Sequence, residues 1–261
     1  MTAEQNDLKI KDQLQVFTPE VVVLPAQEAD EYGWSIFDSQ IRSKPDSTLT
    51  LATGSSPLGI YNLWIAAYRK GLDCSKLIIN NLDEYVGLPK NHPQSYAQFM
   101  NVNLFDRVNV SRFNRFIPDS SAKDPYDEAV RYQKILDRIG PSDLTILGIG
   151  PKLTCHIAFN ERGSSINSHT RVVKIYQETI DANSRFFNSK DEVPTMAITQ
   201  GIADILKSKK IILVAKGLGK AQGIQRTLEG PINSGSPASF LRLHPNVVFV
   251  LDQEAASLLS N

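Results

Sequence analysis

The chain has 261 residues, of which 41% are hydrophobic, so it can bury a sizeable core within one α/β domain. Lysine plus arginine number 28, as do aspartate plus glutamate, and no basic stripe with interleaved aromatic residues is present. This balance argues against nucleic acid and membranes as partners and favours a small ligand. Two cysteines are too few for a disulfide framework and lack metal-ligand spacing with the four histidines, so we expect no metal.

The start of the chain shows no signal segment, and no apolar run has membrane-spanning length. We therefore expect a cytoplasmic protein. Residues 1–18 are polar and aperiodic, and we assign them to an N-terminal extension that precedes a domain over 19–261.

Short apolar runs alternate with helical patterns along this domain. The expected strands are 21–24, 49–52, 76–80, 143–149, 171–175, 210–215 and 246–251. The expected helices are 32–41, 58–69, 95–105, 130–139, 197–206 and 254–259, with 182–187 in or near a further helix. The alternation predicts a single α/β domain of Rossmann-like type, with a mainly parallel sheet covered by helices on both faces.

A turn of small polar residues, Thr53-Gly54-Ser55-Ser56-Pro57, follows the expected strand 49–52. We expect Ser56 as the N-cap and Pro57 as the first residue of the next helix. Free backbone N–H groups, two hydroxyls and a positive helix end would then meet at one point, which suits a phosphate. Ordinary strand-to-helix turns use the same residue types, so both interpretations stay open.

Polar groups also follow other strands. Asp83 and Glu84 come after strand 76–80 on an expected turn, where an open parallel sheet places acid/base groups, although turns also use such residues as caps. Arg185 is a candidate anion ligand or a surface ion-pair residue. The glycine-rich stretch 216–221 brings Lys220 to the start of a helix and reinforces the first turn as an anion site.

The strongest candidate for chemistry is the segment from Cys155 to Glu161, which follows the apolar strand 143–149. It places a general base, His156, near the carboxylate of Glu161 in an apolar setting that shifts pKa values. On a regular strand or helix the two side chains would point to different faces, so the segment must bend for them to cooperate. The alternative is a histidine that serves only in packing or capping.

Several stretches in unbroken order over roughly residues 20–259 together resemble the glucosamine-6-phosphate deaminase (isomerase) family, which is related to the 6-phosphogluconolactonases. The stretches are Leu51-Ala-Thr-Gly-Ser-Ser-Pro-Leu58, Asn81-Leu-Asp-Glu-Tyr-Val-Gly-Leu-Pro89, 92–96, His156-Ile-Ala-Phe-Asn-Glu161, 163–165, 170–171, Asn183-Ser-Arg-Phe-Phe187, 220–221, 228–231 and 243–246.

The resemblance implies an enzyme that converts a hexosamine 6-phosphate to a ketohexose 6-phosphate and ammonia, or the reverse, without a cofactor. Glucosamine 6-phosphate is the expected substrate, and galactosamine 6-phosphate is an alternative. Asp83 matches the family's base for proton transfer between C1 and C2, and His156 and Glu161 match the pair that opens the sugar ring. The expected substrate- and phosphate-binding residues are Thr53, Gly54, Ser55, Ser56, Glu84, Arg185 and Lys220.

One departure from the family pattern lies just before His156. The stretch from Gly150 to His156 is two residues longer than the family's, with Thr154 where an acidic residue is expected and Cys155 where a glycine is expected. A hydroxyl cannot supply the missing charge, so we expect a less basic His156 and slower or water-assisted ring opening. Cys155 is not expected to be a nucleophile, because neighbouring side chains on an extended segment point apart.

Further hypotheses follow from these departures. Allosteric members of the family use basic residues of which Arg171 matches one, but Val173 stands where a lysine is expected, so we expect no such allostery. A non-catalytic or weakly active sugar-phosphate-binding or regulatory homologue is the second hypothesis. Lactone hydrolysis is the third, and it is disfavoured because 83–96 resembles the deaminase branch. The sequence leaves the choice between monomer and homo-oligomer open.

Overall fold

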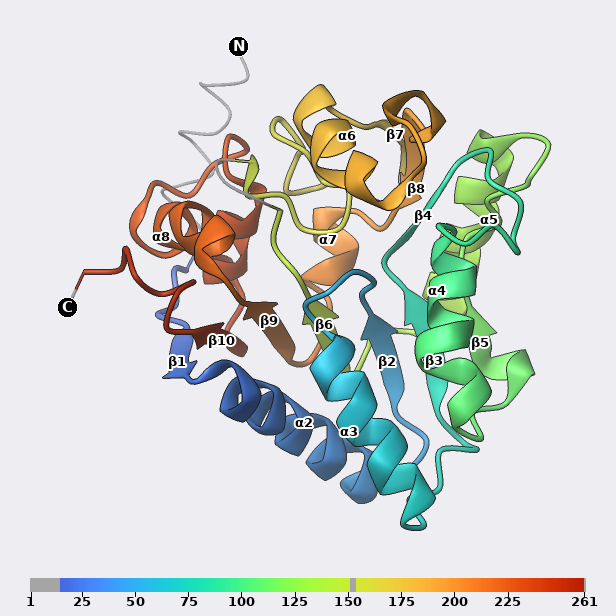
Figure 1. Ribbon diagram of the computed structural model, residues 1–261, viewed down its shortest axis with the longest axis horizontal. Helices are drawn as coiled ribbons and strands as arrows, with labels where there is room; N and C mark the ends of the chain where they lie inside the picture. The colour runs from blue at the N-terminus through green and yellow to red at the C-terminus, as the bar shows by residue number, and fades with distance from the viewer. Residues whose placement is uncertain (1–14, 151–153, 261) are drawn as a thin grey trace.

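The computed structural model describes residues 15–150 and 154–260, which are built on a seven-stranded parallel sheet (Figure 1). In spatial order its strands are β1 (Glu20–Leu24), β10 (Val247–Asp252), β9 (Ile211–Ala215), β6 (Leu144–Leu147), β2 (Thr48–Leu51), β3 (Ile78–Asn81) and β5 (Arg115–Phe116). A second, antiparallel sheet has the order β4 (Asp83–Tyr85), β8 (Met196–Thr199) and β7 (Arg171–Lys174). The prediction of a mainly parallel sheet is confirmed.

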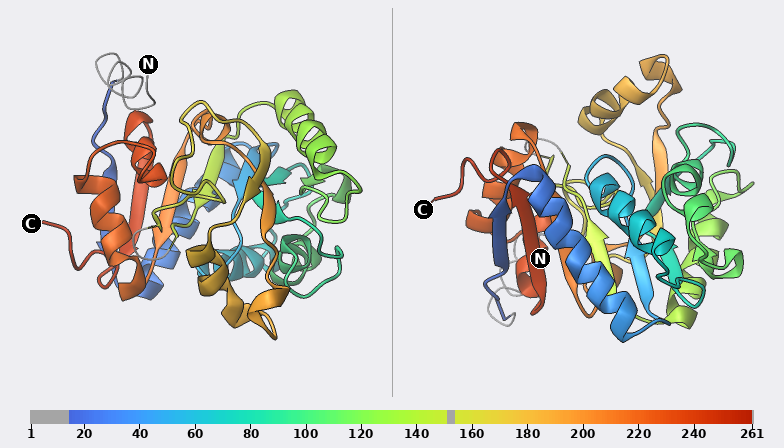
Figure 2. Two further views of the ribbon diagram at one scale, coloured as in Figure 1. Left: turned by 90° about the horizontal axis from the view of Figure 1, so that it is seen from above. Right: turned by 60° about the horizontal axis from the view of Figure 1, so that its bottom comes forward.

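Helices cover both faces of the large sheet, as predicted. Helices α2, α3 and α4 lie along one face and α5 lies on the other (Figure 2). The helix bounds are α2 Ala26–Ser43, α3 Leu58–Arg69, α4 Tyr96–Asn103, α5 Pro125–Ile139, α6 Gln177–Asn183, α7 Ile202–Ile205 and α8 Ala221–Glu229. The 3₁₀ turns are η1 Phe105–Arg107, η2 Arg112–Asn114, η4 Ser184–Phe186, η5 Lys190–Glu192, η6 Leu218–Lys220 and η7 Pro237–Leu243. Across residues 15–150 and 154–260, no helix combines the length and the apolar character needed to cross a bilayer.

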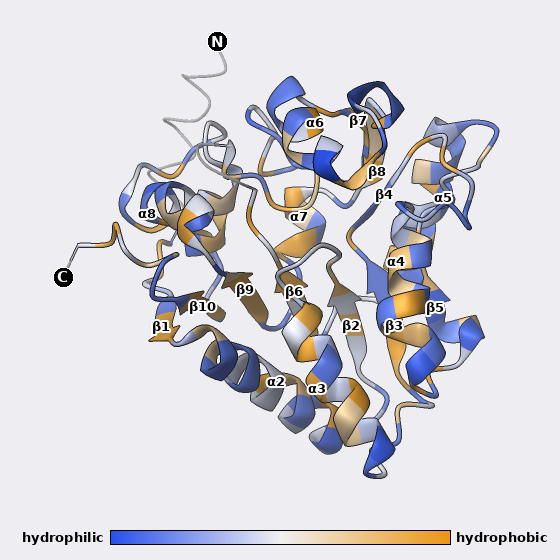
Figure 3. Cartoon of the chain, viewed as in Figure 1, coloured by the Kyte–Doolittle hydropathy of each residue, from blue (hydrophilic) through white to orange (hydrophobic). Residues whose placement is uncertain are grey.

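The core is continuous along the middle of the large sheet. Every residue of β9 and β10 is buried, and these strands carry apolar colours in Figure 3. A strand that is covered on both faces needs apolar side chains on both, which explains their unbroken apolar runs. From α3, Trp64 packs on Phe37 of α2 with ring centroids 5.9 Å apart, and its Nε1–H donates to Cys74 Sγ at 3.1 Å.

Side-chain caps fix two helix starts. Ser95 is the N-cap of α4, as predicted, and its hydroxyl accepts from the Gln98 N–H at 3.1 Å. Helix α5 begins earlier than predicted, because the Asp124 carboxylate accepts from the N–H of Tyr126 at 2.7 Å. The prediction that Ser56 caps α3 is wrong: the preceding residue is Pro57, and no side chain caps that helix.

Two other element predictions are wrong. The stretch 197–206 is not one helix, because Ala197, Ile198 and Thr199 belong to β8 and α7 begins later. Pairing of β8 with both β4 and β7 overrides the local helical pattern, as tertiary context often does. The expected closing helix 254–259 is a run of turns, held by the Asp252 carboxylate, which accepts from the Ala255 N–H at 2.7 Å.

Residues 15–18 of the predicted N-terminal extension are described, and the Phe17 N–H donates to the carbonyl of Arg242 at 2.8 Å. This end of the chain therefore lies beside η7. The division of the chain at residue 19 stays a prediction.

The strand order reverses between β2 and β6, which are neighbours although β3 and β5 lie between them in the sequence. Loops that leave the carboxyl ends of such strands diverge and open a crevice, which is where open α/β sheets bind ligands. The turn 53–56 and the stretch 148–150 flank this point.

Candidate active site

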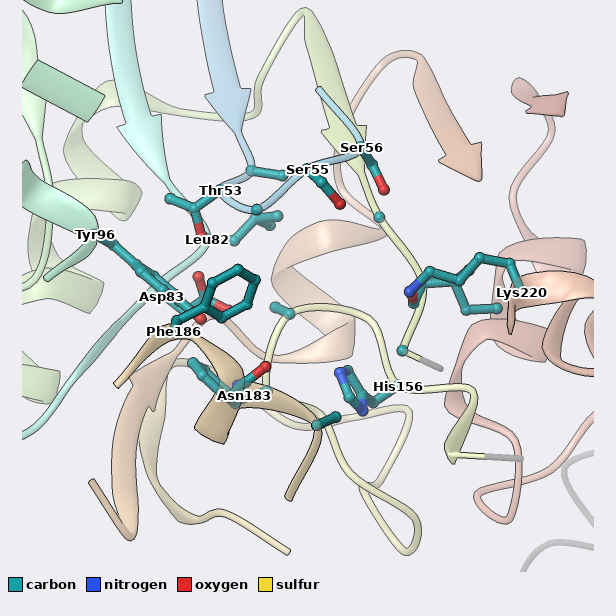
Figure 4. Close-up of a pocket in the computed structure, with 18 of the residues that line it drawn as sticks. Thr53, Ser55, Ser56, Leu82, Asp83, Tyr96, His156, Asn183, Phe186 and Lys220 are labelled. Carbon is teal, nitrogen blue, oxygen red and sulfur yellow. The ribbon is translucent and has the colours of Figure 1, made fainter. Parts of the chain in front are cut away.

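A cavity of about 420 Å³ lies at the carboxyl ends of β2, β3, β6 and β9 (Figure 4). Its lining residues come from the loops after these strands, from α4 and from the segment around α6. They are Ala52, Thr53, Gly54, Ser55, Ser56, Leu82, Asp83, Tyr96, Gly148, Ile149, Gly150, His156, Ala158, Phe159, Ala182, Asn183, Arg185, Phe186, Lys216, Gly219 and Lys220. Eight of the ten predicted site residues are among them; Glu84 and Glu161 are not.

One end of the cavity is formed by the turn after β2. Gly54 has a φ of 86°, a left-handed conformation that glycine adopts without strain, and it directs Ser55 and Ser56 toward the cavity (Figure 4). A Cβ on Gly148 would have an ordinary contact 3.5 Å from Ser56 Oγ, so the stretch after β6 lies beside this turn. The turn presents two hydroxyls and the start of α3 to the cavity, which are groups that bind anions.

Two cations face this turn from other parts of the chain. Lys220, at the end of η6, donates from Nζ to the Ile149 carbonyl at 2.5 Å. Burial, followed by the nearby Arg185 charge, lowers the pKa of Lys220 to about 8. The Arg185 guanidinium lies over the Phe186 ring, 4.6 Å from its centroid. A half-buried ammonium and a stacked guanidinium that repel each other favour an anionic ligand at this end.

The other end of the cavity holds Asp83. The residue lies in β4, paired with Thr199 of β8, rather than on the expected turn. It is 6% exposed, and burial, followed by the charge of Glu84, raises the pKa of its carboxyl group well above the usual range. A carboxylate with a raised pKa is a stronger base, which suits it to proton abstraction from carbon.

Glu84 lies outside the cavity. Its side chain is buried, and its carboxylate accepts from the N–H groups of Tyr85, Tyr96 and Ala97 at 2.8, 2.9 and 2.8 Å. Burial raises its pKa to about 7 in spite of these donors. Strand alternation explains the difference, because Asp83 and Glu84 are neighbours in β4 and point to opposite faces. Glu84 therefore holds the start of α4 against β4.

The segment 155–161 bends, as cooperation of its polar groups requires. Cys155 and Ala158 have φ values of 46° and 50°, and the Asn160 N–H donates to the Ile157 carbonyl at 3.0 Å, which closes a turn. Asn160 Nδ2 donates to the Gln200 carbonyl at 2.9 Å and anchors the turn beside β8. Positive φ costs about 1 kcal/mol or more at a non-glycine residue, and these anchors offset it.

The bend brings His156 Nδ1 to 3.4 Å from Glu161 Oε2. Glu161 Oε1 accepts from the Thr179 hydroxyl at 2.6 Å, which fixes the carboxylate from α6. Burial alone would raise the pKa of Glu161, but the nearby His156 and the hydrogen bond from Thr179 outweigh burial, so the pKa is lowered. The spacing of the two atoms is loose for a hydrogen bond and suits an ion pair once the imidazole is protonated. Glu161 thus acts on the cavity through His156, which lines it.

Gly150 makes room for this imidazole. A Cβ there would lie 2.4 Å from His156 Nδ1 and 2.5 Å from Thr154 Oγ1, far inside van der Waals contact. We expect Gly150→Ala to displace the imidazole and to lower kcat of the deamination that the sequence resemblance implies about tenfold, since small misplacements of catalytic groups are costly. Steady-state kinetics test this, with Gly148→Ala as the matched variant because its Cβ would have an ordinary 3.5 Å contact. Equal kcat values in Gly150→Ala and wild type would contradict the expectation.

The structure describes two residues of the stretch before His156 that departs from the family pattern, Thr154 and Cys155. Thr154 is buried and its Oγ1 approaches the same point above Gly150 as the imidazole does, so a hydroxyl does stand beside His156. Cys155 Sγ points away from the cavity, 3.8 Å from the Gly223 carbonyl. This agrees with the expectation that Cys155 is no nucleophile. The longer loop, 151–153, lies outside the described residues.

Several lining residues escaped the sequence interpretation. Tyr96, Asn183 and Phe186 line the cavity, and Lys216 lines it while its Nζ is bound by the Asp30 carboxylate at 2.6 and 2.7 Å. The sequence offered one indication for two of them: Asn183 and Phe186 lie within two residues of Arg185, which was already a candidate site residue. Tyr96, Asn183 and Phe186 also lie in stretches that carry the family resemblance, but only the structure shows that their side chains line the cavity.

Known proteins are similar to this chain in sequence and in fold. The family model for glucosamine-6-phosphate isomerases/6-phosphogluconolactonase matches residues 25–249. A glucosamine-6-phosphate deaminase from Thermoanaerobacter pseudethanolicus is 44% identical over 240 residues, which cover 92% of this chain and 94% of the relative. One from Cellvibrio japonicus is 43% identical over 242 residues, covering 92% and 91%.

Solved structures agree. A monomeric glucosamine-6-phosphate deaminase, described as a missing link of the NagB superfamily, has a TM-score of 0.89 and 39% identity, covering 92% of this chain and 99% of that one. A 6-phosphogluconolactonase from Trypanosoma brucei, with a TM-score of 0.73 and 20% identity over 94% of this chain and 100% of that one, shares the fold. These matches confirm the resemblance that the sequence motifs carry. The chain belongs to the glucosamine-6-phosphate isomerase/6-phosphogluconolactonase family.

Proposed function

We propose that this protein is an amino-sugar phosphate isomerase and deaminase that converts glucosamine 6-phosphate and water to fructose 6-phosphate and ammonia. The observation that carries the proposal is the meeting, in one cavity, of an anion-binding end with Asp83 and His156. Relatives that carry the deaminase name at 43–45% identity over 92% of the chain support it. The proposed steps require no metal or organic cofactor.

The phosphate of the substrate is assigned to the end of the cavity between the turn 53–56 and Lys220. Ser55 and Ser56 supply hydroxyl donors, Thr53 and Gly54 shape the turn, and Lys220 adds charge. Arg185 approaches from η4 and can bind two phosphate oxygens at once. Holding the phosphate here extends the sugar toward Asp83 and His156.

Ring opening is assigned to His156 with Glu161. The imidazole takes the proton of the C1 hydroxyl and returns it to the ring oxygen, while the bond between C1 and that oxygen breaks to leave the open aldehyde. Glu161 lies 3.4 Å from Nδ1 and stabilises the imidazolium that forms between the two transfers. Thr154 carries no charge, so Glu161 carries this task in the proposed mechanism.

Isomerisation and deamination are assigned to Asp83. Its carboxylate removes the proton from C2 of the open sugar while O1 takes up a proton, which gives an enolamine. Asp83 then delivers its proton to C1, and the amino nitrogen gives up one proton in place of the one that O1 gained, which leaves a C1 hydroxyl and a C2 imine. Water adds to the imine, and the carbon–nitrogen bond breaks to release ammonia and leave the ketone. The reaction consumes one water for each ammonia that it releases.

The second hypothesis, a non-catalytic sugar-phosphate-binding protein, would need the phosphate end alone. The presence of Asp83, His156 and Glu161 at the other end of the site favours the enzyme. The lactonases in the structural comparison are 20% identical or less and support the fold alone, so lactone hydrolysis is not the preferred activity. We also propose a cytoplasmic location, because the proposed substrate is a charged sugar phosphate that does not cross a bilayer unaided.

Ammonia release by purified protein tests the proposal, with glucosamine 6-phosphate and galactosamine 6-phosphate assayed in parallel. Release from the glucosamine epimer supports it, and preferential release from the galactosamine epimer would correct the substrate. If neither sugar releases ammonia while both raise the melting temperature, the binding-protein hypothesis replaces the enzyme, since ligands that bind the native state raise its stability.

A further inference from the structure

Asn183, at the end of α6, projects into the cavity between Asp83 and His156 (Figure 4). Its Nδ2 donates to the hydroxyl of Tyr85 at 2.9 Å. The amide nitrogen lies on the side of Tyr85, and the amide oxygen points into the cavity (Figure 4). A carboxamide oxygen accepts hydrogen bonds and carries no charge.

Tyr85 is a rigid anchor for this amide. The tyrosine is 3% exposed, and its ring contacts those of Tyr96, Phe159 and Phe187 with centroids 4.9, 5.4 and 6.0 Å apart. Its hydroxyl is also hydrogen-bonded to Tyr96. Burial raises the pKa of Tyr85 to about 12, so the hydroxyl stays neutral and stays in place at physiological pH. The amide of Asn183 is therefore held in one orientation.

The polar groups at the two ends of the cavity differ in kind. The phosphate end presents donors, from Ser55, Ser56 and Lys220. Near Asp83 the cavity presents two groups that accept hydrogen bonds, the carboxylate of Asp83 when ionised and the oxygen of Asn183. A protonated amine is a donor with no acceptor capacity, so it matches a pair of acceptors. A hydroxyl carries one proton and cannot satisfy both.

We propose that Asn183 is a specificity-determining residue, whose amide oxygen, held by Tyr85, accepts a hydrogen bond from the amino group at C2 of the sugar phosphate. The inference rests on the proposed function for the substrate class, and on the position of Asn183 for the contact. It assigns recognition of the amine to Asn183 and leaves proton transfer to Asp83. Selection against the corresponding hydroxy sugar then depends on Asn183, because a polar group built to bind a donor discriminates against ligands that lack it.

The test uses glucosamine 6-phosphate and glucose 6-phosphate reduced to their C1 alcohols, which have no aldehyde and cannot be consumed. Their binding is compared by calorimetry in wild type, Asn183→Leu, Asn183→Asp and Tyr85→Phe. We expect Asn183→Leu to weaken the amino alcohol at least tenfold, because a hydrogen bond to a charged group is lost, and to change the hydroxy alcohol less than threefold. Asn183→Asp keeps an acceptor and should keep the preference for the amine. Tyr85→Phe keeps the amide of Asn183 but removes the hydroxyl that orients it, so its affinity for the amine should lie between those of wild type and Asn183→Leu.

Asn188→Leu is the matched control, because Asn188 lies on the same segment but is exposed and bonded to Glu192. Orthophosphate affinity unchanged in every variant would show that the phosphate end is intact. Equal weakening of both sugars, or none, in Asn183→Leu would overturn the inference, as would a wild type with no preference for the amine. If the wild type binds the amine more tightly, depends on Asn183 for this preference and releases no ammonia, the proposed enzyme activity is wrong and the role of Asn183 is supported.

Discussion

Asp83→Asn is expected to lower kcat for ammonia release by about 10²- to 10⁴-fold, the range found when a general base is removed. Asparagine has the shape of aspartate, but its amide cannot take the C2 proton. The backbone of residue 83 is held by pairing with Thr199 in the small sheet, so the site keeps its geometry. Ammonia release under saturating substrate measures the effect, and an unchanged kcat would rule out Asp83 as the base.

The same variant is expected to fold at least as stably as wild type near neutral pH. Burial raises the pKa of Asp83 in the folded state, so the folded protein binds a proton there more tightly than the unfolded chain does. Ionisation then costs stability as pH rises above the carboxyl group's ordinary value, and asparagine removes that cost. Asp46→Asn is the control for charge removal, because Asp46 is exposed. Its kcat and melting temperature should stay near those of wild type. A strongly lowered melting temperature in Asp83→Asn would show that its activity loss reflects unfolding.

Lys220→Met is expected to raise KM about 10- to 100-fold, because a hydrogen bond to a charged group contributes about 1.5–3 kcal/mol. Methionine keeps most of the aliphatic volume but offers neither charge nor donor. Orthophosphate should lose affinity in parallel, since the lost contact is to the phosphate alone. Lys190→Met is the matched control, because Lys190 pairs with Asp181 at 2.7 Å on the surface, where ion pairs contribute little. A KM that stays within twofold of wild type would place the phosphate elsewhere.

Phosphate binding is also expected to weaken in alkali. The pKa of Lys220 is lowered to about 8, so its ammonium is largely charged below that pH and loses its proton above it. Fructose 6-phosphate is the suitable probe, because its phosphate has its second pKa near 6 and its charge is constant over this range. The dissociation constant should rise from pH 8 to pH 9.5 in wild type and stay flatter in Lys220→Met. Parallel pH profiles for the two proteins would contradict the assignment.

Much of the site follows from local chemistry in the sequence. The turn of Gly54, Ser55 and Ser56 and the stretch that ends at Lys220 each consist of residues with distinctive backbone or donor properties directly after an apolar run. Parallel strands end at one edge of a sheet, so such turns meet in space even when they are far apart in the chain. The same reasoning placed Asp83 beside them, and the structure brings these groups into one cavity.

The small sheet was not predictable in this way. Asp83 pairs with Thr199, which lies 116 residues later in the chain, and the stretch that contains β8 has a helical pattern by itself. The same pairing decides which of the two adjacent carboxylates faces the cavity. Strand β4 directs the side chain of Asp83 into the cavity and that of Glu84 toward the start of α4. An isolated pattern of two carboxylates gives no sign of which one faces a ligand.

The sequence by itself determined the alternation of strands and helices, the turns of small polar residues and the family, because each depends on residues that are close together or on motifs in fixed order. Tertiary structure decided the contact between His156 and Glu161, which needs positive φ at Cys155 and Ala158, and the position of Asn183 over the cavity. These features arise from distant anchors, such as Gln200 for the bend and Tyr85 for the amide. Long-range contacts of this kind stabilise conformations that local propensity disfavours, and for that reason they leave no pattern along the chain.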